Sequence, residues 1–125
     1  MASYNLVVLM GNLTKDPELR YTSNNAAVCS FSLAVNRTYT DGNGEKKDEV
    51  CFVDIVCWNR LAEVSAEYLR KGSPAFVEGR LVQRSWETED GKARSKLEVV
   101  ARSVRFLNSG QHSDNDDDSS DDIPF

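Results

Sequence analysis

Two aromatic side chains in the apolar stretch EVCFVDIVCW are placed to do chemistry on one side of a strand. Phe52 and Trp58 are six residues apart, so in an extended strand both point to the same face. Val53 and Ile55 point to the opposite face and are expected to fill a core. Large rings on a face away from the core need a ligand or a partner, because exposed apolar patches are unfavourable in water.

Two more aromatic residues lie next to predicted turns, and basic residues flank the whole set. Tyr39 precedes a glycine-rich hairpin, and Trp86 precedes the turn at Glu89-Asp90-Gly91. Flat rings can stack on unpaired nucleobases while cations neutralise phosphates. The pattern therefore predicts a single-stranded nucleic acid as the ligand. The flanking basic residues are Arg37, Lys46, Lys47, Arg60, Arg84, Lys92, Arg94 and Lys96.

Other functions remain open on these residues. The rings could instead pack under the helix or against a partner subunit. The chain could also be a protein–protein adaptor whose exposed aromatic residues form the interface with its partner. Asp54 and Glu78 could hold a divalent metal, as in a nuclease. The chain has no P-loop and no nucleophile with a matching base, and its one histidine, His112, lies in a polar tail. We therefore expect no enzyme activity, no metal and no cofactor.

The elements that must position these side chains are mostly strands. Residues 27–36 alternate between an apolar face and a small, mostly polar face, which is typical of a half-exposed strand. DPEL (16–19) is predicted to be a turn, and 38–49 a turn-rich connector with Asp-Gly and Asn-Gly signals. The predicted strands cover residues 5–12, 27–36, 49–58, 75–87 and 95–107.

One helix is predicted over residues 59–72, with Asn59 as N-cap and Gly72 as the C-terminal glycine. Three strands, one helix and two strands predict an all-β fold with one short helix. This order matches the OB-fold, a five-stranded Greek-key barrel, here taken as antiparallel, that commonly binds oligonucleotides. The predicted apolar stripe of the helix is Leu61, Val64, Tyr68 and Leu69.

Charge divides the chain into two parts. Six of its 20 acidic residues lie after Gln111, so the rest carries 14 acidic against 15 basic side chains. We expect an OB-fold domain over residues 1–108 and a disordered acidic tail over 109–125. The three cysteines (Cys29, Cys51, Cys57) lack zinc-ligand spacing and are expected to be reduced and buried. With no signal peptide or membrane span, the expected location is cytoplasmic.

Beyond these patterns, the chain resembles the bacterial single-stranded DNA-binding protein family. The resemblance rests on NLVVLMGNLTKDPELRYT, VDIVCWNRLAEVSAEYLRKGSPAFVEGRL and the final DDIPF, in that order. It implies base stacking by Tyr39, Phe52, Trp58 and Trp86. With the flanking cations above, it implies phosphate contacts by Arg20, Arg37, Arg60, Lys71, Arg84, Lys92 and Arg94.

The resemblance also implies biology beyond the DNA contact. It implies a nucleoid-associated homotetramer that coats single-stranded DNA without marked sequence preference. It implies that replication, recombination and repair proteins dock on the C-terminal tip. An apolar pocket with a basic rim would suit that tip, which consists of Asp121, Asp122, Ile123, Pro124 and Phe125.

Four features depart from the family pattern. Tyr39, Phe52 and Trp58 are exchanged in aromatic type relative to better-known members, which should preserve stacking while altering its strength. Asp54 places an acid beside the predicted stacking platform, and Ser85 stands where a cation often precedes the tryptophan. Both suggest weaker phosphate contact or a shifted path of the strand. The spacer before the tip is short, which limits its reach. A preference for RNA also stays open, because flat stacking barely senses the 2′-hydroxyl.

Overall fold

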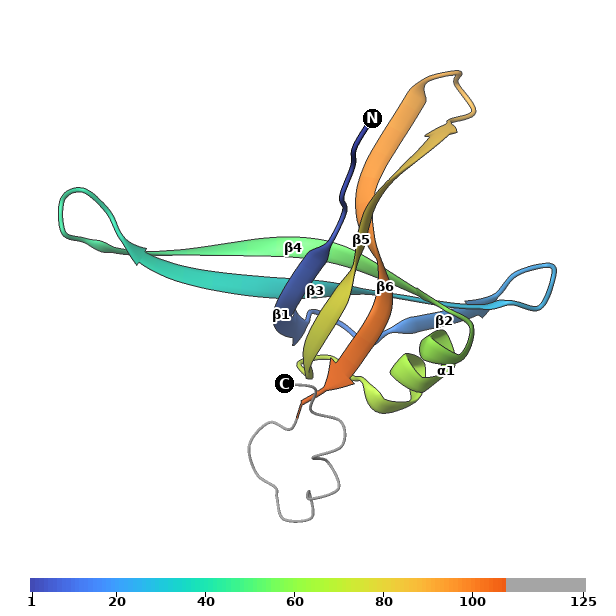
Figure 1. Ribbon diagram of the computed structural model, residues 1–125, viewed down its shortest axis with the longest axis horizontal. Helices are drawn as coiled ribbons and strands as arrows, with labels where there is room; N and C mark the ends of the chain where they lie inside the picture. The colour runs from blue at the N-terminus through green and yellow to red at the C-terminus, as the bar shows by residue number, and fades with distance from the viewer. Residues whose placement is uncertain (108–125) are drawn as a thin grey trace, which may run out of the picture.

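Two long antiparallel strands, β3 (Ala27–Thr40) and β4 (Lys46–Trp58), form one of the two long hairpins of the protein (Figure 1). A computed structural model describes residues 1–107 of the chain. The strands pair from Val28↔Trp58 to Thr40↔Lys46. The predicted connector over 38–49 is therefore mostly strand, and only 41–45 form the turn, where Gly44 has a φ of 80°. The hairpin thus extends well beyond the barrel as an arm.

A second hairpin consists of β5 (Pro74–Glu87) and β6 (Ala93–Phe106). The predicted turn at Glu89-Asp90-Gly91 is confirmed: the Thr88 N–H donates to the Lys92 carbonyl at 2.9 Å, and Gly91 has a φ of 83°. The register between the strands shifts at Glu78/Gly79, where Ser103 and Ala101 are their partners, so β6 carries one extra residue, Arg102, as a bulge. In Figure 1 the tip of this hairpin projects in a different direction from the β3–β4 arm.

β1 (Val7–Leu13) closes the sheet into a barrel. It pairs with β5 on one side and with β3 at Asn12 and Leu13 on the other. The strand order is β1-β5-β6-β4-β3, and the added β1–β3 pairing completes a five-stranded ring. The predicted OB-fold is confirmed, with one correction: β4 and β6 run parallel, at Ile55↔Val99 and Val56↔Val100. The antiparallel arrangement expected throughout is wrong at this one junction.

The predicted turn at DPEL is only half correct. Glu18 and Leu19 belong to a sixth strand, β2 (Glu18–Tyr21), which pairs with β3 outside the ring. All four of its residues are exposed, so no hydrophobic alternation marks it in the sequence. Hydrogen bonding to β3, rather than burial, makes it a strand.

The helix α1 (Asn59–Tyr68) lies between β4 and β5 and is shorter than predicted. Trp58 is the N-cap, while Asn59 has a φ of 59°, a left-handed conformation that asparagine tolerates better than most residues. The helix ends at Tyr68 with Leu69 as its C-cap, so Gly72 is a turn residue rather than the C-terminal glycine. No helix within residues 1–107 is long and apolar enough to cross a membrane.

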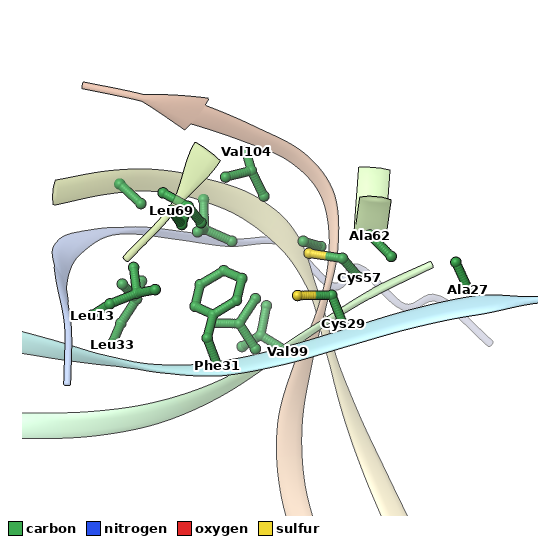
Figure 2. Packing of buried hydrophobic residues seen from close by; sticks show 14 residues of the cluster. Leu13, Ala27, Cys29, Phe31, Leu33, Cys57, Ala62, Leu69, Val99 and Val104 are labelled. Carbon is green, nitrogen blue, oxygen red and sulfur yellow. The ribbon is translucent and has the colours of Figure 1, made fainter. Parts of the chain in front are cut away.

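The core lies inside the ring and under α1. Figure 2 shows Phe31 among the buried side chains, with the Cys29 and Cys57 sulfurs close together. Both cysteines are free and buried, as predicted, but Cys51 is exposed. Cys51 lies on the part of β4 that extends beyond the barrel, where there is no core for its side chain to pack against.

The predicted stripe of the helix is only partly correct. Leu69 is buried and Leu61 packs against the core, as predicted, but Tyr68 is exposed, and the fully buried residues of α1 are Ala62 and Ser65. Ser65 can be buried because its hydroxyl faces the Cys57 sulfur, 3.9 Å away. The predicted tail over 109–125, including its tip, lies outside the described residues, so the division into domain and tail stays a prediction.

Candidate nucleic-acid interface

The outer side of the barrel carries a groove of about 870 Å³, called the outer groove below. It crosses β2, β3, β4 and β6 and takes in one residue of β5. β6 bonds to β4, β4 to β3 and β3 to β2, so these strands form one continuous surface. Side chains that define the outer groove are Arg20, Ser30, Ser32, Trp58, Arg84 and Lys96.

The floor of the outer groove is the small, polar face that the alternation of 27–36 predicts. Ser30 and Ser32 line the groove because Cys29, Phe31 and Leu33 of the same strand point into the core. Short hydroxyl side chains leave room above the sheet. A flat ligand can therefore approach the backbone of β3 closely.

Two of the predicted stacking residues lie on β4, as their spacing requires. Phe52 is 64% exposed and Trp58 is 43% exposed, while Ile55 and Cys57 between them are fully buried. Their shared outward face is thus confirmed. Trp58 lines the outer groove, and Phe52 lies further toward the arm, outside the groove lining.

Trp86 lies on the β5–β6 hairpin, beyond the groove. Its ring is 41% exposed and carries the Arg84 guanidinium 4.9 Å from the ring centroid. Arg84 itself lines the outer groove. The predicted phosphate contact and the predicted stacking ring are therefore in direct cation–π contact, which connects the groove to the hairpin.

A similar cation–π pair, Arg37 and Tyr39, lies on the β3–β4 arm. The Arg37 guanidinium lies 4.6 Å from the Tyr39 ring centroid and pairs with Glu49 on β4 at 3.1 Å. Neither Tyr39 nor Arg37 lines the outer groove. The β3–β4 arm and the β5–β6 hairpin thus each present an arginine that lies over an aromatic ring two residues further along its strand.

The remaining predicted phosphate contacts are spread around the groove. Arg20 lines it from β2 and makes no ion pair within residues 1–107. Arg60 pairs with Glu63 on α1 at 3.7 Å. Lys71, Lys92 and Arg94 are exposed at turns or on the β5–β6 hairpin, where Arg94 is the cross-strand partner of Trp86.

Acidic residues in the outer groove were only partly expected. Asp54 pairs with Lys96, with 2.7 Å between Oδ2 and Nζ, and Glu98 pairs with Arg84 at 3.3 Å. Glu98 was missed by sequence reasoning, although a charged residue inside KLEVV is the signal that would have found it. Glu78 pairs with Arg102 instead. The two acids considered for a metal thus belong to separate ion pairs, and residues 1–107 contain no cluster of three metal-ligand side chains.

The displaced pKa values lie away from this groove. Burial raises the pKa of the Cys29 thiol from 9.0 to about 11. Burial also raises the pKa of Cys57 to about 12, although the Ser65 hydrogen bond opposes this shift. At the β5–β6 turn, the Thr88 hydroxyl donates to Asp90 and lowers the pKa of that carboxyl. Neither core thiol is set up as a nucleophile at neutral pH.

Comparison with known proteins decides the family. Residues 4–107 match the model of the single-strand binding protein family. The chain belongs to this family. It is 51% identical over 110 residues to single-stranded DNA-binding protein 2 of Listeria innocua, covering 88% of this chain and 68% of that protein. It is 54% identical over 103 residues to single-stranded DNA-binding protein A of Bacillus subtilis, covering 82% of this chain and 59% of that protein.

Solved structures of the family share the fold. The Plasmodium falciparum SSB in complex with ssDNA superposes with a TM-score of 0.79 at 27% identity, covering 86% of this chain and 98% of that one. A deletion mutant of the Thermus aquaticus single-stranded DNA-binding protein gives a TM-score of 0.77 at 34% identity, covering 85% of this chain and 51% of that one. The predicted resemblance is therefore confirmed for the folded region.

Proposed function

We propose that this chain binds single-stranded DNA without marked sequence preference and protects it, with no catalytic step. The observation that carries the proposal is the outer groove itself. It combines the half-exposed Trp58 ring, a floor of serines, and the cations Arg20 and Arg84 on one open sheet surface. A ring receives an unpaired base of any identity, and cations attract the phosphates.

The path of the strand follows from where the other rings lie. From the outer groove, the strand continues along β4 toward Phe52 and along the β5–β6 hairpin toward Trp86, whose neighbour Arg94 supplies a further cation. Tyr39 and Arg37 extend the surface on the β3–β4 arm. Lys71, Arg60 and Lys92 act at the margins, where their exposure suits loose phosphate contacts.

Self-association is part of this proposal. The N-terminal segment and β1 expose apolar side chains at Tyr4, Leu6, Val8 and Met10. Alternate exposure along β1 leaves an apolar row that a second copy can cover. We propose that such contacts build the homotetramer. Replacing Val8 and Met10 together by Arg is expected to lower the mass in solution, measured by light scattering, and a chain with unchanged mass would contradict this assignment.

Partner recruitment is proposed for the C-terminal tip. Ile123, Pro124 and Phe125 would enter an apolar pocket of a replication, recombination or repair protein, guided by Asp121 and Asp122. This role suits a cytoplasmic, nucleoid-associated protein. Deleting residues 121–125 is expected to abolish co-purification of such partners while DNA binding is retained.

The test of the proposed function is a fluorescence titration of the full chain with dT oligonucleotides of graded length. Stacking is expected to quench the tryptophan emission, and affinity is expected to fall as salt rises from about 50 mM to about 200 mM. The same titration with rU oligonucleotides measures the preference for DNA. If the wild type does not bind dT at the lower salt, and Phe52→Ala no longer assembles, the chain is instead a protein–protein adaptor.

A further inference from the structure

Two ion pairs lie within the outer groove and use cations that a DNA strand would need. The Lys96 ammonium contacts Asp54 at 2.7 Å, and the Arg84 guanidinium contacts Glu98 at 3.3 Å. All four side chains line the groove. Besides Glu18, which also lines the groove, these pairs place two further carboxylates at positions that the phosphates of a bound strand would approach.

The register of the strands places these pairs. β4 and β6 run parallel with Ile55 beside Val99, which leaves Asp54 facing the stretch of β6 that holds Lys96. On the other side of β6, Arg84 is the cross-strand partner of Lys96 itself, so Glu98 lies diagonally from it. The Glu98 side chain is only 10% exposed and is held by the sheet. Glu98 is thus buried in the groove, while Asp54 lines the groove with its side chain half-exposed.

We infer that Asp54 and Glu98 act as internal competitors of phosphate and limit how tightly this groove holds single-stranded DNA. This inference rests on the proposed function. Binding gains from counterion release only where a phosphate meets a cation that is not already neutralised. Lys96 and Arg84 are neutralised in the free protein, whereas Lys15 and Arg20, which also line the groove, make no ion pair within residues 1–107. The phosphate contacts inside the groove therefore concentrate on Lys15 and Arg20.

An opposite role for Asp54 makes a different prediction. If its carboxylate held the Lys96 ammonium in place for a phosphate, removing the carboxylate would weaken binding. If it competes, removing it frees Lys96 and strengthens binding. The sign of the change therefore separates a competitor from a positioning residue.

The test compares Asp54→Asn with a matched control, Glu78→Gln, in the full chain. Both substitutions remove one negative charge and release one cation, but Glu78 and Arg102 lie outside the groove lining. The dissociation constant for labelled dT is measured over a series of salt concentrations. One added phosphate contact steepens the slope of log K against log salt by about 0.7 on a single strand. The expected gain at low salt is about fivefold or less, because half-exposed ion pairs are weak.

Adding Lys96→Ala to Asp54→Asn gives a double variant with the net charge of the wild type, which separates the inference from overall charge. The double variant is expected to lose the whole gain of Asp54→Asn, because the cation that the carboxylate had released is gone. Lys96→Ala alone is expected to weaken binding, because it leaves the Asp54 carboxylate unpaired in the groove. Glu98→Gln is expected to act like Asp54→Asn, with thermal melts confirming that its buried site is intact.

Specific results would overturn the inference. Equal affinities and slopes for Asp54→Asn and Glu78→Gln would show that only net charge matters, and weaker binding by Asp54→Asn would make it a positioning residue. A wild-type chain that binds no dT would refute the proposed function itself. A wild-type chain that binds normally, with Asp54→Asn matching the control, would refute only the competition.

Discussion

The Trp58 ring is the most informative single perturbation, because it is the one aromatic residue of the predicted stacking set that lines the outer groove. Trp58→Ala leaves the serine floor and the groove cations in place. A base stacked on an aromatic ring is worth about 1–3 kcal/mol, so the affinity for dT should fall by a factor of about 5 to 150. Trp58→Phe keeps a smaller ring, so its affinity for dT should lie between those of the wild type and Trp58→Ala.

Stability must be separated from binding in this experiment. The ring is 43% exposed, so somewhat more than half of its surface packs against the protein. Since removal of a fully buried tryptophan costs about 3–5 kcal/mol, Trp58→Ala should lower the free energy of unfolding by about 2 kcal/mol. Urea titration measures this loss and sets the range in which the variant is folded.

Anisotropy of a labelled dT oligonucleotide is the suitable assay, because it does not rely on the residue that is removed. The chain has two tryptophans, so Trp86→Phe leaves Trp58 as the sole fluorescent reporter of the groove. Its emission should be quenched by dT. If saturating dT does not quench the Trp58 emission of Trp86→Phe, the bases do not stack on Trp58.

Tyr68→Ala is the matched control. Tyr68 is equally aromatic and more exposed, but it lies on α1 with its ring 5.7 Å from that of Phe106, outside the groove lining. Its removal should leave the affinity unchanged. If folded Trp58→Ala binds dT within about twofold of the wild type, as Tyr68→Ala does, stacking in the outer groove is refuted, since the smallest stacking energy predicts about fivefold.

Three further predictions concern the body of the barrel. Iodoacetamide should label Cys51 alone in the native chain at neutral pH and all three cysteines after denaturation, as read by mass spectrometry, because Cys29 and Cys57 are buried; rapid labelling of a second thiol would contradict the packing. The folded pKa values of about 11 and about 12 exceed the ordinary 9.0, so the contribution of these two thiols to stability should be constant below about pH 9 and decline as the pH rises toward those values. Cys57→Ala should flatten that decline in alkaline melts, and an unchanged decline would assign it to other groups. Ile55→Ala should cost about 2–5 kcal/mol in urea unfolding, because Ile55 is fully buried, whereas a loss below about 1 kcal/mol would mean that the core closes over the cavity.

The residues that local patterning predicted correctly are those on strands with one buried face. Alternation placed Cys29, Phe31 and Leu33 inward, and the spacing of Phe52 and Trp58 placed both rings outward. A period of two follows from the pleat of any strand, whatever its partners. Turn residues were equally local, as the Glu89–Gly91 turn shows.

Local patterning failed where the reason for a structure lies in another strand. β2 has no buried residue and exists because β3 offers it an open edge. The buried Ser65 contradicts a hydrophobic stripe, and only the Cys57 sulfur across from it makes its position acceptable. The β3–β4 arm also extends further than predicted, because cross-strand contacts such as the bond from the Thr38 hydroxyl to Asp48, at 3.0 Å, stabilise polar strand segments without a core.

The amino-acid sequence by itself determined the barrel, its one helix, the family and the outward direction of the aromatic rings. Tertiary structure alone decided which of those rings share a groove with cations, and that two groove cations are already held by carboxylates. The physical reason is the range of the interactions. Side-chain direction depends on backbone geometry within a few residues, whereas the Asp54–Lys96 pair depends on the parallel register of β4 and β6, which joins residues about forty positions apart.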